Sequence, residues 1–232
     1  MTNEKMIERI YEISSKLSAE DKATFDRYVN NENLTSVALK VLDTLPLLLA
    51  KLLIDCKNDL KCDVAKQNGS LSRLKAAEKV IKRAKLDRRE LLHGAWEDPE
   101  GRQCFCDGFV AFRLYDHLPL DVLNSKLDPF DLNRVVVKNV GAKLALPDVA
   151  TLKAFIKTEK ARLRAEKKGN RVIYRFGDNL PSVDAEFLLE ALEILPGCEA
   201  FASQEKPQLR AIYFKSNYGD GVVLPISLKE GS

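Results

Sequence analysis

The chain after Ser70 contains the same succession of elements twice: one helix-like segment followed by three strand-like segments. The helix-like segments are 71–87 and 184–195, each with apolar residues at helical spacing. The strands expected after the first are 90–97, 103–106 and 109–114, and those expected after the second are 198–202, 209–214 and 222–227. One helix on a short antiparallel sheet buries too little apolar surface to be stable alone. We therefore expect an α+β fold in which two helix-plus-antiparallel-sheet halves share a core.

Two Asp-Gly dipeptides support this division into halves. Asp107 and Asp220 are each followed by glycine and flanked by apolar runs, a pattern typical of tight hairpin turns. Leu74 precedes Asp107 by 33 residues, and Phe187 precedes Asp220 by the same distance. We interpret the equal spacing as an internal duplication. The alternative is two independent α+β elements whose spacing agrees by chance.

The segment between the two halves contains a long charged helix. A stretch rich in Pro, Asp and Asn at 118–133 is expected to be a loop, and 134–140 is a candidate strand. Residues 147–168 are expected to form the charged helix. A strand is expected at 171–176, and a turn and connector at 177–183.

The first part of the chain has only helical patterns. Residues 4–30 are expected to form two helices, with a capping box at Ser18 and Asp21. A third helix is expected from Thr35 to Lys61. Leucines cover nearly all sides of this third helix, so we expect it to be buried, either in its own bundle or against a partner.

These patterns divide the chain into two regions. An α-helical N-terminal region, 1–66, precedes an α+β domain, 71–232. The polar stretch 63–70 contains a glycine and is expected to be the linker between them.

Parts of the second region resemble a DNA sliding-clamp domain, such as those of the bacterial DNA polymerase III beta subunit. The stretch LKAAEKVIKRAKLDRRELLHGAWEDPEGRQCFCDGFVAFRL (Leu74–Leu114) is similar to the opening half of such a domain. The stretches VDAEFLLEALEILPG (Val183–Gly197) and KPQLRAIYFKSNYGDGVVLPIS (Lys206–Ser227) are similar to its closing part. The resemblance covers 71–232, notably as seen in uncharacterised clamp-like proteins of Firmicutes and their phages.

This resemblance implies a non-enzymatic, DNA-associated protein of a phage or mobile element that acts in DNA replication without a cofactor. Clamps encircle duplex DNA with basic inward helices and bind partner proteins through a hydrophobic pocket. The implied partners are therefore duplex DNA, replication proteins or further copies of the chain. The beta subunit has three such domains per chain and this chain has one, so a ring would need several chains or another protein.

Two helices carry basic residues at a spacing that places them on one face. On helix 71–87 these residues are Lys75, Lys79, Lys82 and Arg83, and on helix 147–168 they are Lys153, Lys157, Lys160, Arg164 and Lys167. A basic stripe on a packed helix suits phosphate binding, because each neutralised phosphate releases counterions. We predict that these residues contact the DNA backbone without reading bases. The alternative is two solvated helix faces.

The helix 184–195 argues against a simple ring. Its acidic residues are Asp184, Glu186, Glu190 and Glu193. A channel lined by this helix would repel phosphate. The acidic helix favours an alternative function, a protein–protein interaction module with a clamp-like fold that does not bind DNA.

The sequence contains no constellation for catalysis or metal binding. Cys104 and Cys106 alternate in a strand and are expected to be core thiols, and His93 is expected to be half-buried in the same sheet. His117 follows Asp116, but no motif places a nucleophile beside this pair. Phosphate-binding, dinucleotide-binding and hydrolase motifs are absent from the sequence. We therefore expect no enzyme activity, no metal site and no cofactor.

Composition restricts the remaining functions. The net charge is only +3, so attraction to nucleic acid has to come from a local patch. The start of the chain does not read as a signal peptide and the five cysteines are irregularly spaced, so we expect reduced thiols and a cytoplasmic location. The most apolar run, 45–54, is about half the ~20 residues of a membrane span, so no membrane partner is expected.

Overall fold

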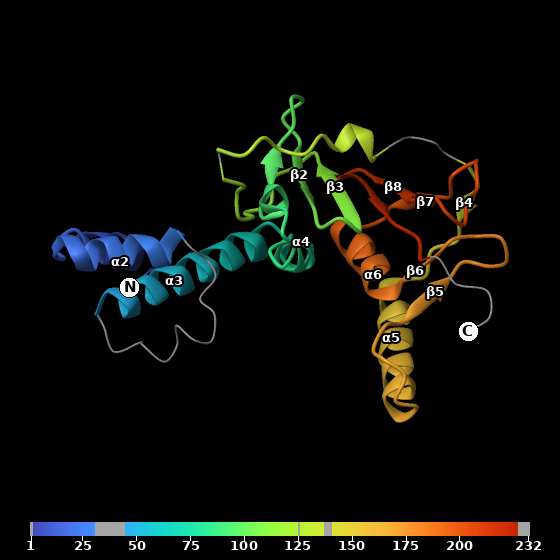
Figure 1. Cartoon of the computed structure of the whole chain (residues 1–232), viewed down its shortest axis with the longest axis horizontal. Helices are drawn as coiled ribbons and strands as arrows, with labels where there is room; N and C mark the ends of the chain where they lie inside the picture. The colour runs from blue at the N-terminus through green and yellow to red at the C-terminus, as the bar shows by residue number, and fades with distance from the viewer. Residues whose placement is uncertain (1, 31–44, 125, 137–140, 227–232) are drawn as a thin grey trace. The chain divides into compact units, whose positions relative to one another are not determined.

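The computed structural model describes residues 2–30, 45–124, 126–136 and 141–226 (Figure 1). The chain divides into two compact units, residues 1–69 and residues 70–232. The first is helical, and the second combines helices with a mostly antiparallel sheet, so the predicted α+β fold class is confirmed. Among the described residues, no helix is both long enough and apolar enough to cross a bilayer.

Three helices surround a small core in the first unit. They are α1 (Asn3–Ser14), α2 (Ala19–Asn30) and α3 (Leu45–Gln67), and α3 packs against both of the others. The predicted capping box is confirmed, because the Ser18 hydroxyl accepts a hydrogen bond from the Asp21 N–H at 3.2 Å. The buried residues of the core are Ile10, Phe25, Leu49, Ala50, Leu53 and Cys56.

Two predictions for the third helix are wrong. Helix α3 continues to Gln67, so most of the predicted linker over 63–70 is helical. Leu48 is 51% exposed and Leu52 is 43% exposed, so the helix is not buried on all sides. The predicted start at Thr35 lies outside the described residues.

A seven-stranded sheet forms the base of the second unit. The strand order is β1-β2-β3-β9-β8-β7-β4, and every neighbouring pair is antiparallel. The strands are β1 (Trp96–Glu97), β2 (Gln103–Cys106), β3 (Val110–Leu114), β4 (Lys143–Leu144), β7 (Glu199–Phe201), β8 (Ile212–Ser216) and β9 (Gly219–Val223). A separate small sheet pairs β5 (Ile173–Arg175) with β6 (Ser182–Asp184).

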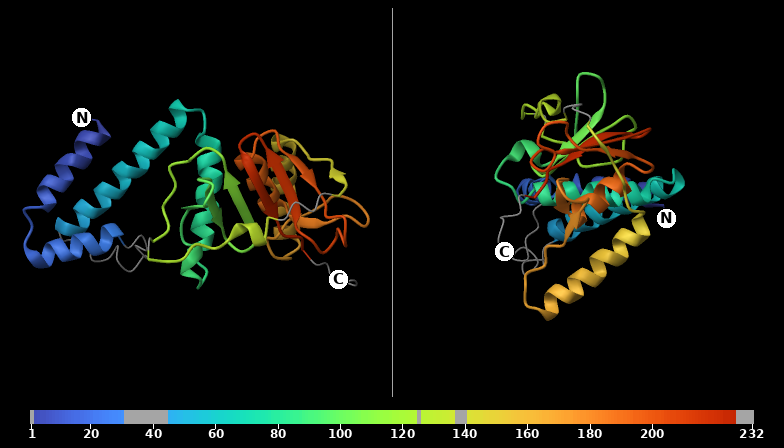
Figure 2. Two further views of the ribbon diagram at one scale, coloured as in Figure 1. Left: turned by 90° about the horizontal axis from the view of Figure 1, so that it is seen from above. Right: turned by 90° about the vertical axis from the view of Figure 1, so that its right-hand side faces the viewer.

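The order of elements is the same in the two halves of the second unit. Helix α4 (Leu71–Ala84) precedes β1, β2 and β3, and α6 (Ala185–Ile194) precedes β7, β8 and β9. The halves meet where β3 pairs with β9. From this centre outward, the strands are β3, β2 and β1 in one half and β9, β8 and β7 in the other. Helices α4 and α6 pack side by side on one side of the sheet, and α5 (Val149–Ala165) packs against α6 (Figures 1 and 2).

A row of aromatic side chains joins the sheet to the helices. Phe105, Phe112 and Phe214 are fully buried, and the strand register places them in one line across the sheet. Gly221 is the remaining member of this line, between Phe112 and Phe214. A Cβ atom at Gly221 would lie 2.5 Å from Phe112 Cδ1, so glycine leaves the space that the ring occupies.

The prediction of a hairpin tip at Asp220 is wrong. Asp220 and Gly221 lie inside β9, and the turn between β8 and β9 is at 217–218. Asp107 does occupy the β2–β3 hairpin, where its carboxylate accepts two backbone N–H bonds at 2.8 Å, and Gly108 has a φ of +91°. The equal spacing of the two Asp-Gly dipeptides therefore does not mark equivalent turns.

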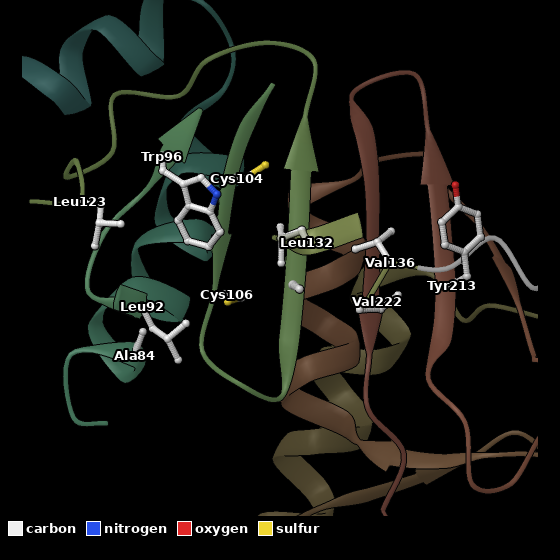
Figure 3. Packing of buried hydrophobic residues seen from close by; sticks show 11 residues of the cluster. Ala84, Leu92, Trp96, Cys104, Cys106, Leu123, Leu132, Val136, Tyr213 and Val222 are labelled. Carbon is white, nitrogen blue, oxygen red and sulfur yellow. The ribbon is translucent and has the colours of Figure 1, made fainter. Parts of the chain in front are cut away.

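The other side of the sheet is covered by the loop that follows β3. Leu123 and Leu132 from this loop pack in one cluster with Trp96, Tyr213 and Val222 of the strands (Figure 3). Both sides of the sheet are thus buried, one under helices and one under a loop. In the described part of 118–133 the prediction of a loop agrees with this arrangement, apart from a short 3₁₀ turn that begins at Leu132.

Three predictions about short segments differ from the structure. The expected strand 90–97 is a 3₁₀ helix, η2 (Glu90–Leu92), followed by the two residues of β1. The expected strand 134–140 begins in a second 3₁₀ helix, η3 (Leu132–Arg134), and its last four residues lie outside the described ranges. The expected connector 177–183 contains the start of β6.

Candidate nucleic-acid interface

Three of the four basic residues predicted on α4 point to solvent. Lys75, Lys79 and Lys82 are exposed, whereas the opposite face of the helix is buried against the sheet and α6. None of the three takes part in an ion pair within the described ranges. We call Lys75, Lys79 and Lys82 the α4 row.

The fourth residue, Arg83, points inward and holds the two halves together. Its guanidinium donates two hydrogen bonds to Glu190 on α6, at 2.9 and 2.7 Å, and a third to Asp107 at the β2–β3 hairpin. It also lies 4.5 Å from the centre of the Phe187 ring. Its charge is already matched by two carboxylates, so the prediction that Arg83 lies with the lysines on the phosphate-binding face is not supported by its position.

At this cluster, burial and the neighbouring charges shift the pKa values of Glu190 and Arg83 in opposite directions. Burial raises the pKa of Glu190 above its ordinary value, although Arg83 opposes this effect. Burial also disfavours the charge of Arg83, but the hydrogen bonds and negative charges of Glu190 and Asp107 outweigh it and raise the pKa of Arg83. Arg83 therefore stays charged and compensates two buried carboxylates.

Helix α5 presents basic residues of two kinds. Lys153 and Lys160 reach toward α6, where their Nζ atoms lie 2.6 Å from Glu193 Oε1 and 2.5 Å from Glu186 Oε1. Lys157 and Arg164 are exposed on α5. Lys167 is exposed too, but the prediction that it shares their helix face is wrong, because α5 ends at Ala165 and Lys167 has a φ of +56°. Within the described part of the chain these three residues form no ion pair. We call Lys157, Arg164 and Lys167 the α5 row.

The acidic residues of α6 are all matched by basic ones. Glu186, Glu190 and Glu193 pair with α5 and α4 as described above. Asp184 caps the helix by accepting the Glu186 N–H at 2.9 Å and also accepts a hydrogen bond from Arg171 at 3.0 Å. The objection that this helix would repel phosphate is therefore much weaker in the folded structure than in the sequence.

The spacing of charged residues in the sequence contains a signal for the ion pairs between α5 and α6. The two lysines of α5 that meet α6 are seven residues apart, and so are the two glutamates that receive them. Matching spacing of opposite charges on two helices is the pattern expected when the helices pack side by side.

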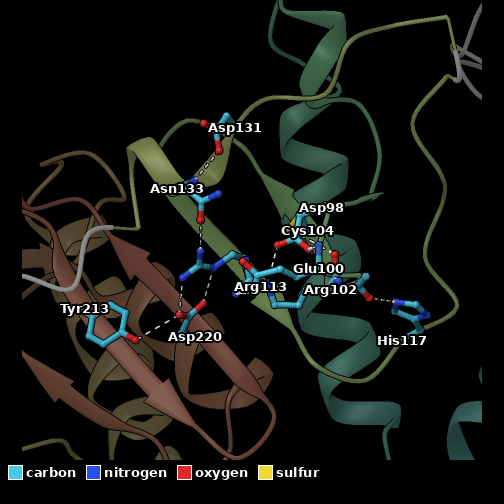
Figure 4. A network of polar contacts seen from close by, with 11 residues as sticks. Asp98, Glu100, Arg102, Cys104, Arg113, His117, Asp131, Asn133, Tyr213 and Asp220 are labelled. Atoms are coloured by element: carbon cyan, nitrogen blue, oxygen red, sulfur yellow. Dashed lines mark hydrogen bonds and ion pairs between the residues drawn. The ribbon is translucent and has the colours of Figure 1, made fainter.

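A second polar network lies at the junction of the halves and is structural. Arg113 on β3 donates to both carboxylate oxygens of Asp220 on β9, at 2.8 and 2.6 Å (Figure 4). Tyr213 donates to the same carboxylate at 3.2 Å, and Asn133 accepts from Arg113 at 2.7 Å. Burial raises the pKa of Tyr213 to about 12. All of these groups have partners, so the network offers no free acid or base.

The cysteine, histidine and aspartate residues that could serve catalysis or metal binding are buried as thiols or have hydrogen-bond partners. Burial raises the pKa of the Cys104 thiol to about 12 and that of Cys106 to about 11, so both remain protonated core thiols. Asp116 pairs with Arg73 at 2.5 and 2.8 Å, whereas His117 Nε2 lies 3.2 Å from the Gly101 carbonyl oxygen, so the two side chains bond to different partners. His93 Nε2 lies 2.8 Å from the Asp87 carbonyl oxygen, and the ring is half-buried beside a 3₁₀ helix rather than in a strand.

Within the described ranges, no group of three or more His, Cys, Asp or Glu residues is placed to hold a metal ion.

Comparison with known proteins adds no family to this description. No protein-family model, no curated protein and no solved structure matches the chain.

Proposed function

We propose that the second unit binds duplex DNA through phosphate contacts from the α4 row and the α5 row, without reading the base sequence. The observation that carries the proposal is the distribution of charge over the three helices on one side of the sheet. Six exposed cations lie on α4 and at α5, and the acids of α6, which packs against both helices, are matched by other basic residues. The resemblance to a sliding-clamp unit is a second support.

This mode of binding has a characteristic dependence on salt. A protein that neutralises Z phosphates of duplex DNA loses affinity with a logarithmic slope of about −0.9Z. Six contacts would therefore give a slope of about −5. Phosphate contacts carry no sequence information, so two unrelated duplexes should bind equally well.

Fluorescence anisotropy with two labelled duplexes tests the proposal at about 50 and 200 mM salt. We expect binding of both duplexes at the lower concentration and a steep loss at the higher one. Absence of binding at low salt would overturn the proposal.

Charge reversal tests whether the α4 row is part of the surface that binds DNA. The triple variant Lys75→Glu, Lys79→Glu and Lys82→Glu should lose most of its affinity and show a smaller salt slope. A matched control reverses three exposed cations elsewhere in the same unit, Lys126, Lys206 and Arg210. Equal loss in the two triple variants would show that net charge, and not the α4 row, causes the attraction.

The alternative, an interaction module that does not bind DNA, makes the opposite prediction. Reversal of Lys157, Lys160 and Arg164 should leave such a module bound to a partner that docks elsewhere on the unit, and the wild-type chain should then show no anisotropy change with DNA.

A further inference from the structure

A shallow groove of about 470 Å³ lies along the surface of α5 beside α6. Its apolar lining consists of Ile156 and Leu189 beside α6 and of Ala161 at the opposite edge. Its rim is basic and consists of Lys153, Lys157, Lys160 and Arg164. Phosphate contact alone gives no reason for an apolar lining, so this groove requires a separate explanation.

The ion pairs show how α5 and α6 are aligned. Lys153 pairs with Glu193 and Lys160 pairs with Glu186, so the residue numbers rise along one helix as they fall along the other. The two helices are therefore antiparallel. Between the ion pairs, Ile156 on α5 is buried and Leu189 on α6 is half-buried.

Each helix contributes a simple pattern to this contact. On α5 the pattern is cation, apolar residue, cation at i, i+3 and i+7: Lys153, Ile156 and Lys160. On α6 it is acid, apolar residue, acid at the same spacing: Glu186, Leu189 and Glu193. Residues at this spacing share one helix face, so α6 is an example, within the chain itself, of a helix that α5 accepts.

The other edge of the groove carries a related pattern, with its apolar residue at i+4 instead of i+3, and none of the described helices lies against it. Lys157, Ala161 and Arg164 again read cation, apolar residue, cation over seven residues. All three are exposed, and Lys157 and Arg164 form no ion pair with any described residue. The side chain of Ala161 is small, so a larger apolar side chain could lie over it and reach the rest of the apolar lining.

We propose that this groove binds an acidic amphipathic helix of a partner protein, antiparallel to α5, with the pattern Glu-x-x-Leu-x-x-x-Glu. The two glutamates pair with Arg164 and Lys157, and the leucine lies on Ile156, Ala161 and Leu189. The cations from Lys153 to Arg164 extend over roughly 16 Å of helix, which is about three turns of a bound helix. Laying one apolar helix face into a groove is an established mode of peptide recognition.

A designed peptide can test this directly on the full chain. The probe is a labelled alanine- and glutamine-rich helix of about 16 residues that carries the proposed pattern once, since shorter helices are marginal in water. The control peptide replaces both glutamates by glutamine. We expect the probe to bind at low salt and the control to bind at least about tenfold more weakly, a difference of about 1.4 kcal/mol. Equal binding of the two peptides, or no binding of the probe, would overturn the proposal.

A charge swap locates the contact. The variant Lys157→Glu with Arg164→Glu should lose the acidic probe and should gain affinity for a peptide with lysine in place of both glutamates. The variant Ala161→Glu should lose the acidic probe as well, because it adds a negative charge to the apolar lining. Failure of the swapped pair to recover binding would place the probe elsewhere and overturn the proposal, provided that circular dichroism shows the variant to be folded.

The inference does not rest on DNA binding, and the two can fail separately. The α4-row variant should lose duplex DNA and keep the peptide. If the α4-row variant loses the acidic probe as well as the DNA, the probe binds to a general polyanion surface and the peptide proposal is wrong.

Discussion

Arg113 Nη2 and Asp220 Oδ2 lie 2.6 Å apart where β3 pairs with β9, and each side chain is only 4% exposed. The bond joins the two halves of the second unit at the centre of their common sheet. The hydrogen bonds and charge of Asp220 raise the pKa of Arg113, although burial opposes this, so the pair remains ionised.

Removing one member of this pair should be costly. An unpaired buried charge destabilises a protein by about 3–5 kcal/mol, whereas apolar replacement of both partners is often close to neutral. We expect Arg113→Leu to lower the free energy of unfolding by that amount, and Arg113→Leu with Asp220→Leu to recover much of it. Urea unfolding followed by circular dichroism measures both. The exposed pair Lys143–Glu199 is the control, and its removal should have no measurable effect.

Gly221 should not tolerate a side chain. A Cβ atom there would lie 2.5 Å from Phe112 Cδ1 and 2.8 Å from the Ala111 carbonyl oxygen. Overpacking of this kind costs about 1–3 kcal/mol, so we expect Gly221→Ala to lower the thermal unfolding midpoint. Phe112→Val has no δ carbons and should recover part of the loss in the double variant. An unchanged midpoint in Gly221→Ala would show that the ring moves aside freely.

Arg83 and Lys82 are neighbours with opposite expected roles. Arg83→Met leaves the carboxylates of Asp107 and Glu190 buried without their cation, so we expect a loss of about 3–5 kcal/mol in the free energy of unfolding. Lys82→Met should leave stability unchanged and weaken DNA binding.

The loss in Arg83→Met should depend on pH in a defined direction. Burial raises the pKa of Glu190, so the folded state holds its proton more tightly than the unfolded state does. Stability from this group therefore falls as pH rises from the ordinary value of 4.5 through the raised pKa. Without Arg83 this pKa rises further, so the loss should be smaller near pH 4.5 than at neutral pH. A pH-independent loss in urea unfolding would contradict this account.

Asp116 should contribute to acid unfolding. Hydrogen bonds from Arg73 lower the pKa of Asp116 below its ordinary value of 3.8, although burial opposes them. A lowered pKa gives stability that is fully present above 3.8 and is lost as pH falls through the folded value. We expect Asp116→Asn to be less stable than wild type at neutral pH and to converge with it in acid. Asp178→Asn, which removes an exposed carboxyl, is the control for the loss of one negative charge.

The sequence predicted well the elements whose apolar residues recur at a regular spacing. Apolar spacing located α4, α5 and α6, and the expectation of two halves sharing a core follows from how little each could bury alone. Two-residue strands such as β4 carry too few residues to show a period, so they were not predicted.

The sequence was a poor guide where the deciding neighbour is distant along the chain. Gly221 follows an aspartate, as a turn glycine would, but its role is set by the ring of Phe112 on another strand. Arg83 shares a helix face with lysines by spacing alone, and only Glu190 and Asp107 turn it inward. The cations that pair with the acids of α6 lie on α4 and α5, so they cannot be read from the segment 184–195 alone.

The outermost strands of the sheet, β1 and β4, span two residues each. An edge this short offers an incoming strand very few backbone donors and acceptors, which protects a sheet from edge-to-edge aggregation. Recruitment by strand addition is therefore disfavoured at both ends of the sheet. Side-chain contacts, which both proposals above use, are the mode of binding that these short edges leave open to the sheet.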